Sequence, residues 1–217
     1  MKVALTGTRA EPLRRRLRAE GLEVLHCPLV RIEAFEGPPL RVADYDWVVL
    51  TSRNAVECLF ARIEGDMSWV AAIGPGTAEA LRERGVEPDL VPQESTQEGL
   101  VAAFPRRAGP VLFAGAEGAR GVIVDKLGAD FVPLYRTVEL LPQSFPDADV
   151  VLLASPSAAR ALAAVRRDLP TVAIGPVTTA EARGLGLTVA AEAESPTPEE
   201  ITRAVKLAAS RRVSSRS

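Results

Sequence analysis

Small and hydroxyl-bearing residues stand where predicted strands give way to predicted helices. Two such segments are residues 48–55 (VVLTSRNA) and 72–79 (AIGPGTAE), and each recurs later in the chain, at residues 151–158 (VLLASPSA) and 173–180 (AIGPVTTA). Glycine lets the main chain approach a ligand closely, and a Ser or Thr hydroxyl can both cap a helix and donate outward. The unpaired amides of a first helical turn suit carboxylates or phosphates. These segments therefore predict anion binding at strand ends.

The same residues also have a purely structural interpretation. A hydroxyl at a helix start is by default an N-cap, and duplication would copy such a cap together with everything else. Arg9, Arg53 and Asn54 lie just beyond predicted strand ends and are open to two interpretations, as anion contacts or as ordinary surface groups. Both alternatives stand at this point.

The sequence does not have the residue clusters that several classes of chemistry need. His26 is the single histidine, the lysines lie apart at Lys2, Lys126 and Lys206, and the only cysteines are Cys27 and Cys58. We therefore expect no metal site, no Schiff-base lysine and no disulfide framework. No phosphate-binding loop or complete dinucleotide fingerprint occurs either. An enzyme made from this set would use hydroxyls, backbone amides and arginines, without a cofactor, on an intrinsically reactive substrate.

Composition narrows the class of protein further. The formal net charge of −2 argues against a nucleic-acid binder. The apolar runs are far shorter than the roughly 20 residues that cross a bilayer, and the chain starts without a signal-peptide pattern. We expect a protein that binds neither nucleic acid nor membrane and is located in the cytoplasm.

Short runs rich in Val, Leu and Ile alternate with amphipathic stretches, which is typical of an α/β fold with parallel sheets covered by helices. The predicted strands are residues 3–6, 22–27, 47–51, 69–73, 111–114, 130–134, 150–154, 171–174 and 187–190. The predicted helices are residues 12–20, 55–63, 77–84, 97–104, 119–127, 158–166, 179–185 and 199–209.

An internal repeat underlies this pattern. Besides the two segments above, residues 28–31 (PLVR) match residues 133–136 (PLYR) more weakly. All three pairs follow one another in the same order. The chain is therefore predicted to be a duplication of one α/β unit.

The order of these motifs resembles that of the uroporphyrinogen-III synthases. The segments that carry the resemblance are LTSRNAV (50–56), AIGPGTA (72–78), PLYRT (133–137), ASPSA (154–158) and AIGPVTTA (173–180). Each alone is weak evidence, because similar strings recur in α/β proteins. Five in order, in a chain of this length, are specific, and the fit extends to about residue 209.

The resemblance implies two flavodoxin-like α/β domains joined by a two-stranded β linker. One domain would be discontinuous, formed by residues 1–32 plus 142–217, and the other would comprise residues 39–133. The linker strands would be residues 33–38 and 134–141. The repeat would then be interleaved in space, and the anion-binding strand ends of the two domains would line a shared cleft.

The implied activity is the cyclisation of hydroxymethylbilane to uroporphyrinogen III, with inversion of the terminal pyrrole ring. Loss of the terminal hydroxyl gives an azafulvenium cation, which passes through a spiro intermediate before the ring closes. No cofactor is implied. The resemblance also implies a monomer, and a transient contact with the preceding pathway enzyme is a further expectation.

Individual roles come from the same resemblance. Tyr135 matches the family's tyrosine near the second linker strand and would donate to the leaving hydroxyl; the alternative is a half-buried strand tyrosine. Thr178 is the second catalytic candidate and matches the hydroxyl that follows the family's Ile-Gly-Pro segment, where the family usually has Thr-Thr directly after the proline. Val177 intervenes here, which leaves open whether Thr178 or Thr179 faces the cleft. The substrate-binding candidates are Thr77, Ser52, Ser155 and Ser157, followed by Arg9 and Asn54.

Two other classes of protein remain open. A two-domain protein that closes on a small anionic ligand without chemistry would use the same strand ends. A flavin-binding relative of flavodoxin would need aromatic rings to stack on the flavin, and the chain has only two Trp and two Tyr residues.

Overall fold

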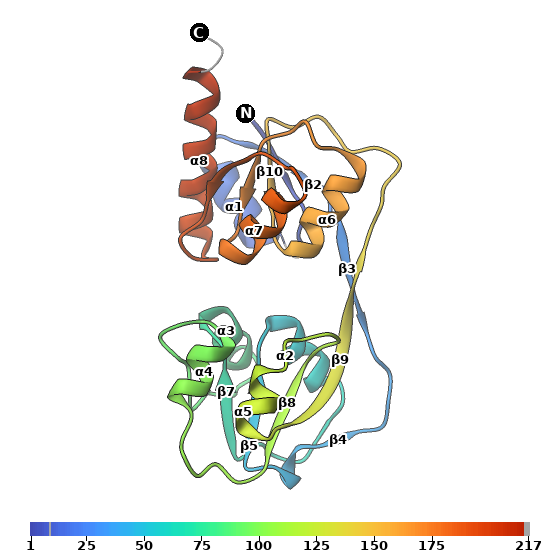
Figure 1. Ribbon diagram of the computed structural model, residues 1–217, viewed down its shortest axis with the longest axis vertical. Helices are drawn as coiled ribbons and strands as arrows, with labels where there is room; N and C mark the ends of the chain where they lie inside the picture. The colour runs from blue at the N-terminus through green and yellow to red at the C-terminus, as the bar shows by residue number, and fades with distance from the viewer. Residues whose placement is uncertain (9, 215–217) are drawn as a thin grey trace. The chain divides into compact units, whose positions relative to one another are not determined.

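The computed structural model describes residues 1–8 and 10–214, which divide into two compact units. Unit 1 comprises Met1–Arg31 and the part of the chain from Val138 onward, and unit 2 comprises Ile32–Thr137. Each unit has its own five-stranded sheet and its own set of helices (Figure 1). Unit 1 is therefore assembled from both ends of the chain, whereas unit 2 is one continuous segment.

The sheet of unit 1 has the strand order β12-β11-β10-β1-β2, and every neighbouring pair is parallel. Its strands are β1 (Lys2–Leu5), β2 (Glu23–His26), β10 (Val150–Leu153), β11 (Thr171–Ala173) and β12 (Val189–Glu192). Its helices are α1 (Glu11–Ala19), α6 (Pro156–Val165), α7 (Pro176–Gly184) and α8 (Pro198–Ser214).

Both faces of this sheet are covered. Ala4, Val151 and Leu153 pack with apolar residues of α6 and α7, while the alternate strand residues Val3 and Leu5 pack with those of α1 and α8. The layers can be followed in Figure 1. Because successive strand side chains point to opposite faces, a strand covered on both sides becomes a continuous apolar run, as the sequence has it.

The sheet of unit 2 has the strand order β3-β9-β8-β5-β7. Its strands are β3 (Val30–Ala34), β5 (Trp47–Leu50), β7 (Trp69–Ala72), β8 (Val111–Ala116) and β9 (Asp130–Glu139). Its helices are α2 (Arg53–Phe60), α3 (Pro75–Arg82), α4 (Gln97–Ala103) and α5 (Val122–Leu127). A small parallel ladder of β4 (Leu40–Arg41) and β6 (Ile63–Glu64), with a 3-10 turn at Val42–Asp44, completes the unit.

The four strands β7, β5, β8 and β9 are parallel. One face packs on α2 and α3 through residues such as Val48 and Leu50, and the other packs on α4 and α5 through Val49 and Phe113.

Strands β3 and β9 are the two places where the chain passes from one unit to the other. The Phe35 N–H donates to the Leu134 carbonyl, and the Leu140 N–H donates to the Leu29 carbonyl, 2.8 Å in each case. As residue numbers rise along one segment they fall along its partner, so the two segments run in opposite directions.

The predicted α/β class, with two parallel sheets covered by helices, is confirmed. All eight predicted helices are present, but several begin earlier than expected: α2 at Arg53, α3 at Pro75 and α7 at Pro176. The reason is local, because each follows directly on its cap, and proline is well suited to the first helical position. The strands β4 and β6, of two residues each, are too short to give a periodic pattern and were not predicted.

The repeated segments adopt the same local structure in both units. Ser52 and Ser155 are both extended N-caps, and their hydroxyl oxygens accept from the N–H of Ala55 (3.0 Å) and Ala158 (3.1 Å). The caps of α3 and α7 are glycines, again extended, each followed by proline.

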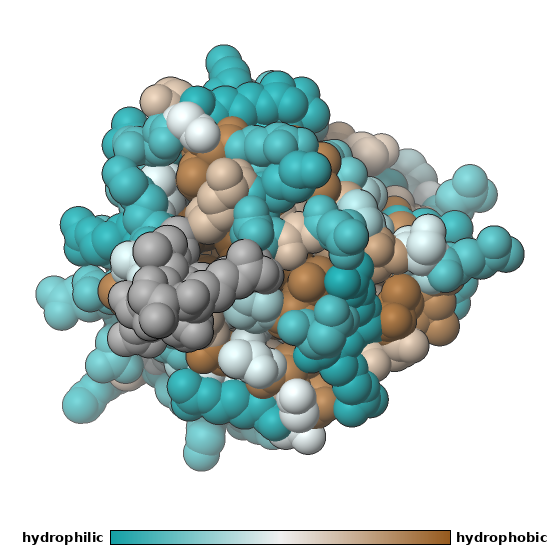
Figure 2. All heavy atoms as spheres, turned by 90° about the horizontal axis from the view of Figure 1, so that it is seen from above, coloured by the Kyte–Doolittle hydropathy of each residue, from teal (hydrophilic) through white to brown (hydrophobic). Residues whose placement is uncertain are grey.

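Charged and polar side chains occupy much of the surface seen in Figure 2, with smaller apolar areas between them.

Candidate functional site

Tyr135 is a buried side chain of β9 and belongs to the apolar core against α2 and α3, with 5% of its surface exposed. The register between β8 and β9 shifts at Gly115/Ala116, so that Pro133 pairs with Gly115 and Tyr135 with Ala116. A bulge of this kind re-aims side chains, and here the consecutive residues Leu134 and Tyr135 both enter the same core.

The Tyr135 hydroxyl lies 2.8 Å from the Ser52 hydroxyl, and either can be the donor. Ser52 already accepts from the Ala55 N–H as the cap of α2. A hydroxyl has two acceptor lone pairs and one proton, so the capping bond leaves Ser52 free to bind the phenol as well. The phenol is thus held at the first turn of a helix that follows the carboxyl end of β5.

The pKa of Tyr135 is raised above its ordinary value, chiefly because burial disfavours the charged phenolate. Hydrogen bonding to Ser52 and Asn54 acts in the opposite direction, and the nearby Cys58 raises the pKa further. With an ordinary value of about 10, a raised pKa keeps the phenol protonated at neutral pH. Tyr135 is therefore neutral and able to donate a hydrogen bond.

Thr77 lies in the first turn of α3, 5% exposed, with its N–H directed to the Gly74 carbonyl at 3.1 Å. A Cβ at Gly74 would lie 2.5 Å from the Ser95 hydroxyl oxygen, so this tight turn requires glycine. The helix start that carries Thr77 is therefore closely packed from the outside by the segment that leads into α4.

The Arg53 side chain, for which the sequence left two interpretations, forms ion pairs with two glutamates of the protein. Its guanidinium donates to Glu79 and to Glu83, 2.6 Å in each case. These carboxylates lie on α3 and at its C-cap.

In unit 1, Ser155 caps α6 and Ser157 follows in the first turn of the same helix. The Ser157 hydroxyl accepts from Arg160 at 3.1 Å. Arg160 also pairs with Glu139 at 2.7 Å and with Glu181 at 2.9 Å. Arg160 was not singled out from the sequence, although its position one turn after Ser157 is a usable signal.

Thr178 and Thr179 are both buried in the first turns of α7, with 3% and 4% of their surfaces exposed. The Thr179 hydroxyl oxygen is enclosed and has no hydrogen-bond partner within the described chain. Val177, by contrast, is 72% exposed. The residue that stands between Pro176 and the two threonines therefore faces solvent.

The structure thus brings Tyr135, Ser52 and Asn54 together, with Thr77 on the neighbouring helix start of unit 2. The unit 1 candidates are distributed over two helix starts, Ser155 and Ser157 on α6 and Thr178 on α7. Arg9 lies outside the described residues.

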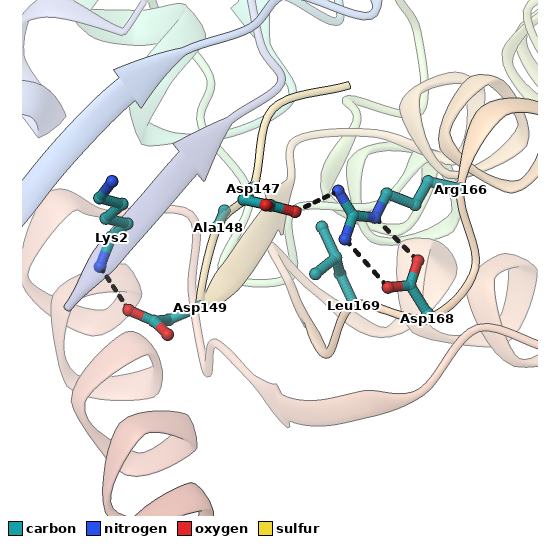
Figure 3. A pocket seen from close by; sticks show the side chains of 7 residues that line it. All are labelled: Lys2, Asp147, Ala148, Asp149, Arg166, Asp168 and Leu169. Atoms are coloured by element: carbon teal, nitrogen blue, oxygen red, sulfur yellow. Dashed lines mark hydrogen bonds and ion pairs between the residues drawn. The ribbon is translucent and has the colours of Figure 1, made fainter. Parts of the chain in front are cut away.

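A pocket of about 250 Å³ lies at the opposite, amino-terminal edge of the unit 1 sheet (Figure 3). Its charged lining is Lys2, Asp147, Asp149, Arg166 and Asp168. The Arg166 guanidinium pairs with Asp147 at 2.7 Å and with Asp168 at 2.8 Å, and the Lys2 backbone N–H donates to Asp149 at 2.8 Å. These charges connect the starts of neighbouring strands, and none of the candidate site residues lines this pocket.

Two kinds of feature are absent from the part of the chain that the structure describes. Across residues 1–8 and 10–214, no helix is both long and apolar enough to span a membrane. Over the same residues, no cluster of three or more His, Cys, Asp or Glu side chains is arranged to hold a metal ion.

Together, the fold and these helix starts define a two-unit α/β protein of the kind that binds ligands at the carboxyl ends of its strands. The chain belongs to the uroporphyrinogen-III synthase family. The sequence model of that family, described as "Uroporphyrinogen-III synthase HemD", matches residues 11–203.

Individual relatives agree with this assignment. The uroporphyrinogen-III synthase of Synechococcus elongatus is 32% identical in an alignment of 167 positions that covers 66% of this chain and 62% of the relative. A putative uroporphyrinogen-III synthase of Methanocaldococcus jannaschii is 27% identical in an alignment of 151 positions that covers 64% of this chain and 63% of the relative. The matched part therefore spans somewhat less than two thirds of each relative's length.

Solved structures share the fold at low sequence identity. The uroporphyrinogen-III synthetase of Helicobacter pylori superposes with a TM-score of 0.67 at 16% identity, covering 96% of this chain and 98% of the other. A mutant uroporphyrinogen III synthase of Thermus thermophilus gives a TM-score of 0.63 at 16% identity, covering 97% and 99%. The two-unit architecture is thus that of solved members of the family.

Proposed function

We propose that the protein is a uroporphyrinogen-III synthase, a cyclising hydro-lyase that converts hydroxymethylbilane to uroporphyrinogen III in tetrapyrrole biosynthesis. The observation that carries the proposal, beyond family membership, is the buried and protonated Tyr135 phenol held by Ser52 at the start of α2. This reaction begins with the departure of a hydroxyl group, which requires a proton donor and little else.

In the proposed mechanism Tyr135 donates a hydrogen bond to the terminal hydroxyl of the substrate. Tyr135 passes its proton to this hydroxyl as the C–O bond breaks, so the oxygen leaves as water, and the nitrogen of the pyrrole that carried the hydroxymethyl group stabilises the resulting azafulvenium cation with its electron pair. The phenolate regains a proton when the ring carbon that makes the final bond loses its hydrogen. Because burial keeps the phenol protonated, the donor is in the required state at neutral pH. By holding the cation in place, the site favours bonding to the substituted carbon of the pyrrole at the opposite end of the chain, which is the ring that becomes inverted. This step gives the spiro intermediate and competes with direct closure, which leaves that ring as it was.

The substrate's carboxylates would be bound by the first-turn amides of α2, α3, α6 and α7, which point their unpaired N–H groups beyond the carboxyl ends of the strands. The hydroxyl residues at these starts, Ser52, Thr77, Ser155, Ser157 and Thr178, are the proposed side-chain contacts, with Asn54 and Arg9 as additional ones. Hydrogen bonds to ionised carboxylates are stronger than neutral ones, which suits a substrate with many such groups.

Of the two threonines left open, Thr178 is the proposed contact. It occupies the same place in α7 as Thr77 in α3, whereas the counterpart of Thr179 is Ala78. The enclosed Thr179 hydroxyl is less suited to reach a ligand.

The decisive test is to add purified protein to freshly generated hydroxymethylbilane and to separate the products by chromatography. Isomer III supports the synthase. Isomer I alone, which forms spontaneously, would contradict it; tight binding of the bilane without isomer III would then support the alternative of a two-domain binding protein for an anionic ligand.

We further propose that the protein acts as a cofactor-free monomer in the cytoplasm. The hydroxyl and amide groups of the proposed site need no prosthetic group for this chemistry. Sedimentation of the purified chain tests the monomer, and a colourless active preparation excludes a bound flavin.

A further inference from the structure

The Arg53 side chain connects two helices of unit 2 beside Tyr135. Arg53 is the first residue of α2, and its neighbours on either side, Ser52 and Asn54, are the residues whose hydrogen bonds act on the Tyr135 phenol. The route by which Arg53 can act on Tyr135 is the turn to which Ser52 and Asn54 belong, because both of these residues hydrogen-bond to the phenol.

The other end of this connection is α3. The two glutamates that accept from Arg53, Glu79 and Glu83, are spaced one helical turn apart along α3 and its C-cap. The helix α3 also carries Thr77 in its first turn. A single guanidinium thus fixes the turn that holds the phenol against the helix that carries a proposed carboxylate contact.

We infer that Arg53 is a positioning residue for the proposed reaction: with Glu79 and Glu83 it holds the start of α2 so that Ser52 and Asn54 keep Tyr135 in place. The expected effect on kcat rests on the proposed function, whereas the expected effect on the position of Tyr135 does not. Direct binding of a substrate carboxylate is the competing role. The guanidinium is only 28% exposed and already has two carboxylate partners, which a substrate would have to displace.

Unit 1 has an arginine–glutamate connection of the same kind at a different position. There Arg160 of α6 pairs with Glu181 of α7. By the internal repeat, the counterpart of Arg53 is Pro156 and the counterpart of Arg160 is Glu57. The duplication therefore did not copy the connection, yet both helix pairs that carry proposed contacts have an arginine–glutamate pair between them.

The test exploits the fact that the chain has only two tyrosines. Tyr45 donates to Asp130 at the start of β9 and not to a residue of the α2 turn, and Tyr45→Phe leaves Tyr135 as the single phenol. In that background the ionisation of Tyr135 is followed by ultraviolet absorbance in Arg53→Met, in Glu79→Gln/Glu83→Gln and in the triple variant. Arg82→Met is the matched control, because Arg82 pairs with Glu87 and not with α2.

The expected result is an upward shift of the Tyr135 pKa in Arg53→Met, because the bonds from Ser52 and Asn54 that favour the phenolate are weakened. The double glutamine variant should give the same shift, and the triple variant should add nothing, since all three remove one connection. The kcat for isomer III should fall about tenfold in each, with KM changed by less than about twofold. Arg82→Met should change neither quantity.

A raised KM in Arg53→Met, with an unchanged Tyr135 titration and an unaffected double glutamine variant, would overturn the inference and assign Arg53 to direct substrate binding. If Arg53→Met does not fold, as circular dichroism will show, the double glutamine variant decides alone. The titration needs no substrate, so it tests the positioning role even if wild-type protein forms no isomer III and the proposed function fails.

Discussion

Unit 1 and unit 2 are built from corresponding strands in the same spatial order. By the repeated segments, β10 and β11 of unit 1 correspond to β5 and β7 of unit 2. Beside them lie β1 and β2 in unit 1, and β8 and β9 in unit 2. An isolated bridge between Ala71 and Leu90 takes the place of β12. Each unit thus combines the first half of one copy with the second half of the other.

The units differ where the chemistry is proposed. The match of residues 28–31 with 133–136 places Val30 of unit 1 at the position of Tyr135. Val30 is buried in the unit 1 core, whereas Tyr135 bonds to Ser52. Ser155 caps its helix as Ser52 does, but it has no phenol at the corresponding place. Duplication therefore provided two edges with the same kind of helix starts, and only unit 2 has the proposed proton donor.

The largest expected effect tests whether the two units have independent cores. Leu29 and Leu134 are corresponding residues, both fully buried, and each substitution to alanine should lower the free energy of unfolding by about 3 kcal/mol. Chemical denaturation followed by circular dichroism measures this, and hydrogen exchange shows which unit is affected. Leu141→Ala, at a side chain 64% exposed, is the control and should change little. A loss of protection in both units from either variant would contradict independence.

Tyr135→Phe tests the assignment of chemistry to unit 2. Turnover to isomer III should fall about a hundredfold, because the phenyl ring keeps the packing but cannot donate to the leaving hydroxyl. Product chromatography under saturating substrate measures it. Tyr45→Phe should retain wild-type turnover. Equal rates for wild type and Tyr135→Phe would remove Tyr135 from the mechanism without removing the function.

The N-cap serines of α2 and α6 allow a direct comparison of the two units, and the expected effects are of intermediate size. Ser52→Ala and Ser155→Ala each lose one capping bond and should each cost about 1 kcal/mol of unfolding free energy. Only Ser52→Ala also removes the partner of Tyr135, so it alone should lower kcat, by about fivefold. Thermal denaturation and initial rates are measured on both variants. The same kcat loss in both would mean that the serines act in the same way.

The smallest effects concern exposed ion pairs, one in each unit. Hydrogen bonding to Arg166 lowers the pKa of Asp168, and hydrogen bonding to Arg120 lowers the pKa of Glu98. For a carboxylate with a lowered pKa, the stabilisation is present above its ordinary value, 3.8 for Asp168 and 4.5 for Glu98, and fades as the pH falls below it. Asp168→Asn and Glu98→Gln should each show a slightly weaker fall of Tm on acidification than wild type. Melting curves between about pH 6 and pH 3 check this, and a steeper fall in either variant would contradict it.

Much of this fold could be predicted from local patterns. The four-residue strands β5 and β10 are covered on both faces, so they are apolar throughout and stand out from the helices that follow. The helices after these strands were predicted as well, but they begin two residues earlier than expected, directly after the caps Ser52 and Ser155. The interleaving of the repeat could not be derived in this way, since it depends on pairings such as Val3 with Val150, far apart in the sequence. It was expected only from the family resemblance.

The details of the site were beyond the reach of local patterns. The Ser52–Tyr135 bond joins the cap that follows β5 to a residue of β9, and these two strands are not neighbours in the sheet. The bulge at Gly115/Ala116, which directs the Tyr135 side chain, has no signature in the sequence. The sequence left Arg53 open as an anion contact or an ordinary surface group and gave Arg160 no role, because an ion pair between helices is decided by packing rather than by spacing along the chain.

The place of β1 also determines when each unit can form during synthesis. β1 lies inside the unit 1 sheet, between β10 and β2, and is the earliest of the described strands to leave the ribosome. It must wait for β10 before its second edge is paired, and unit 2 is translated in the interval. We expect unit 2 to complete its sheet first on the nascent chain, leaving the first strands of unit 1 reliant on chaperones until the last third of the protein emerges.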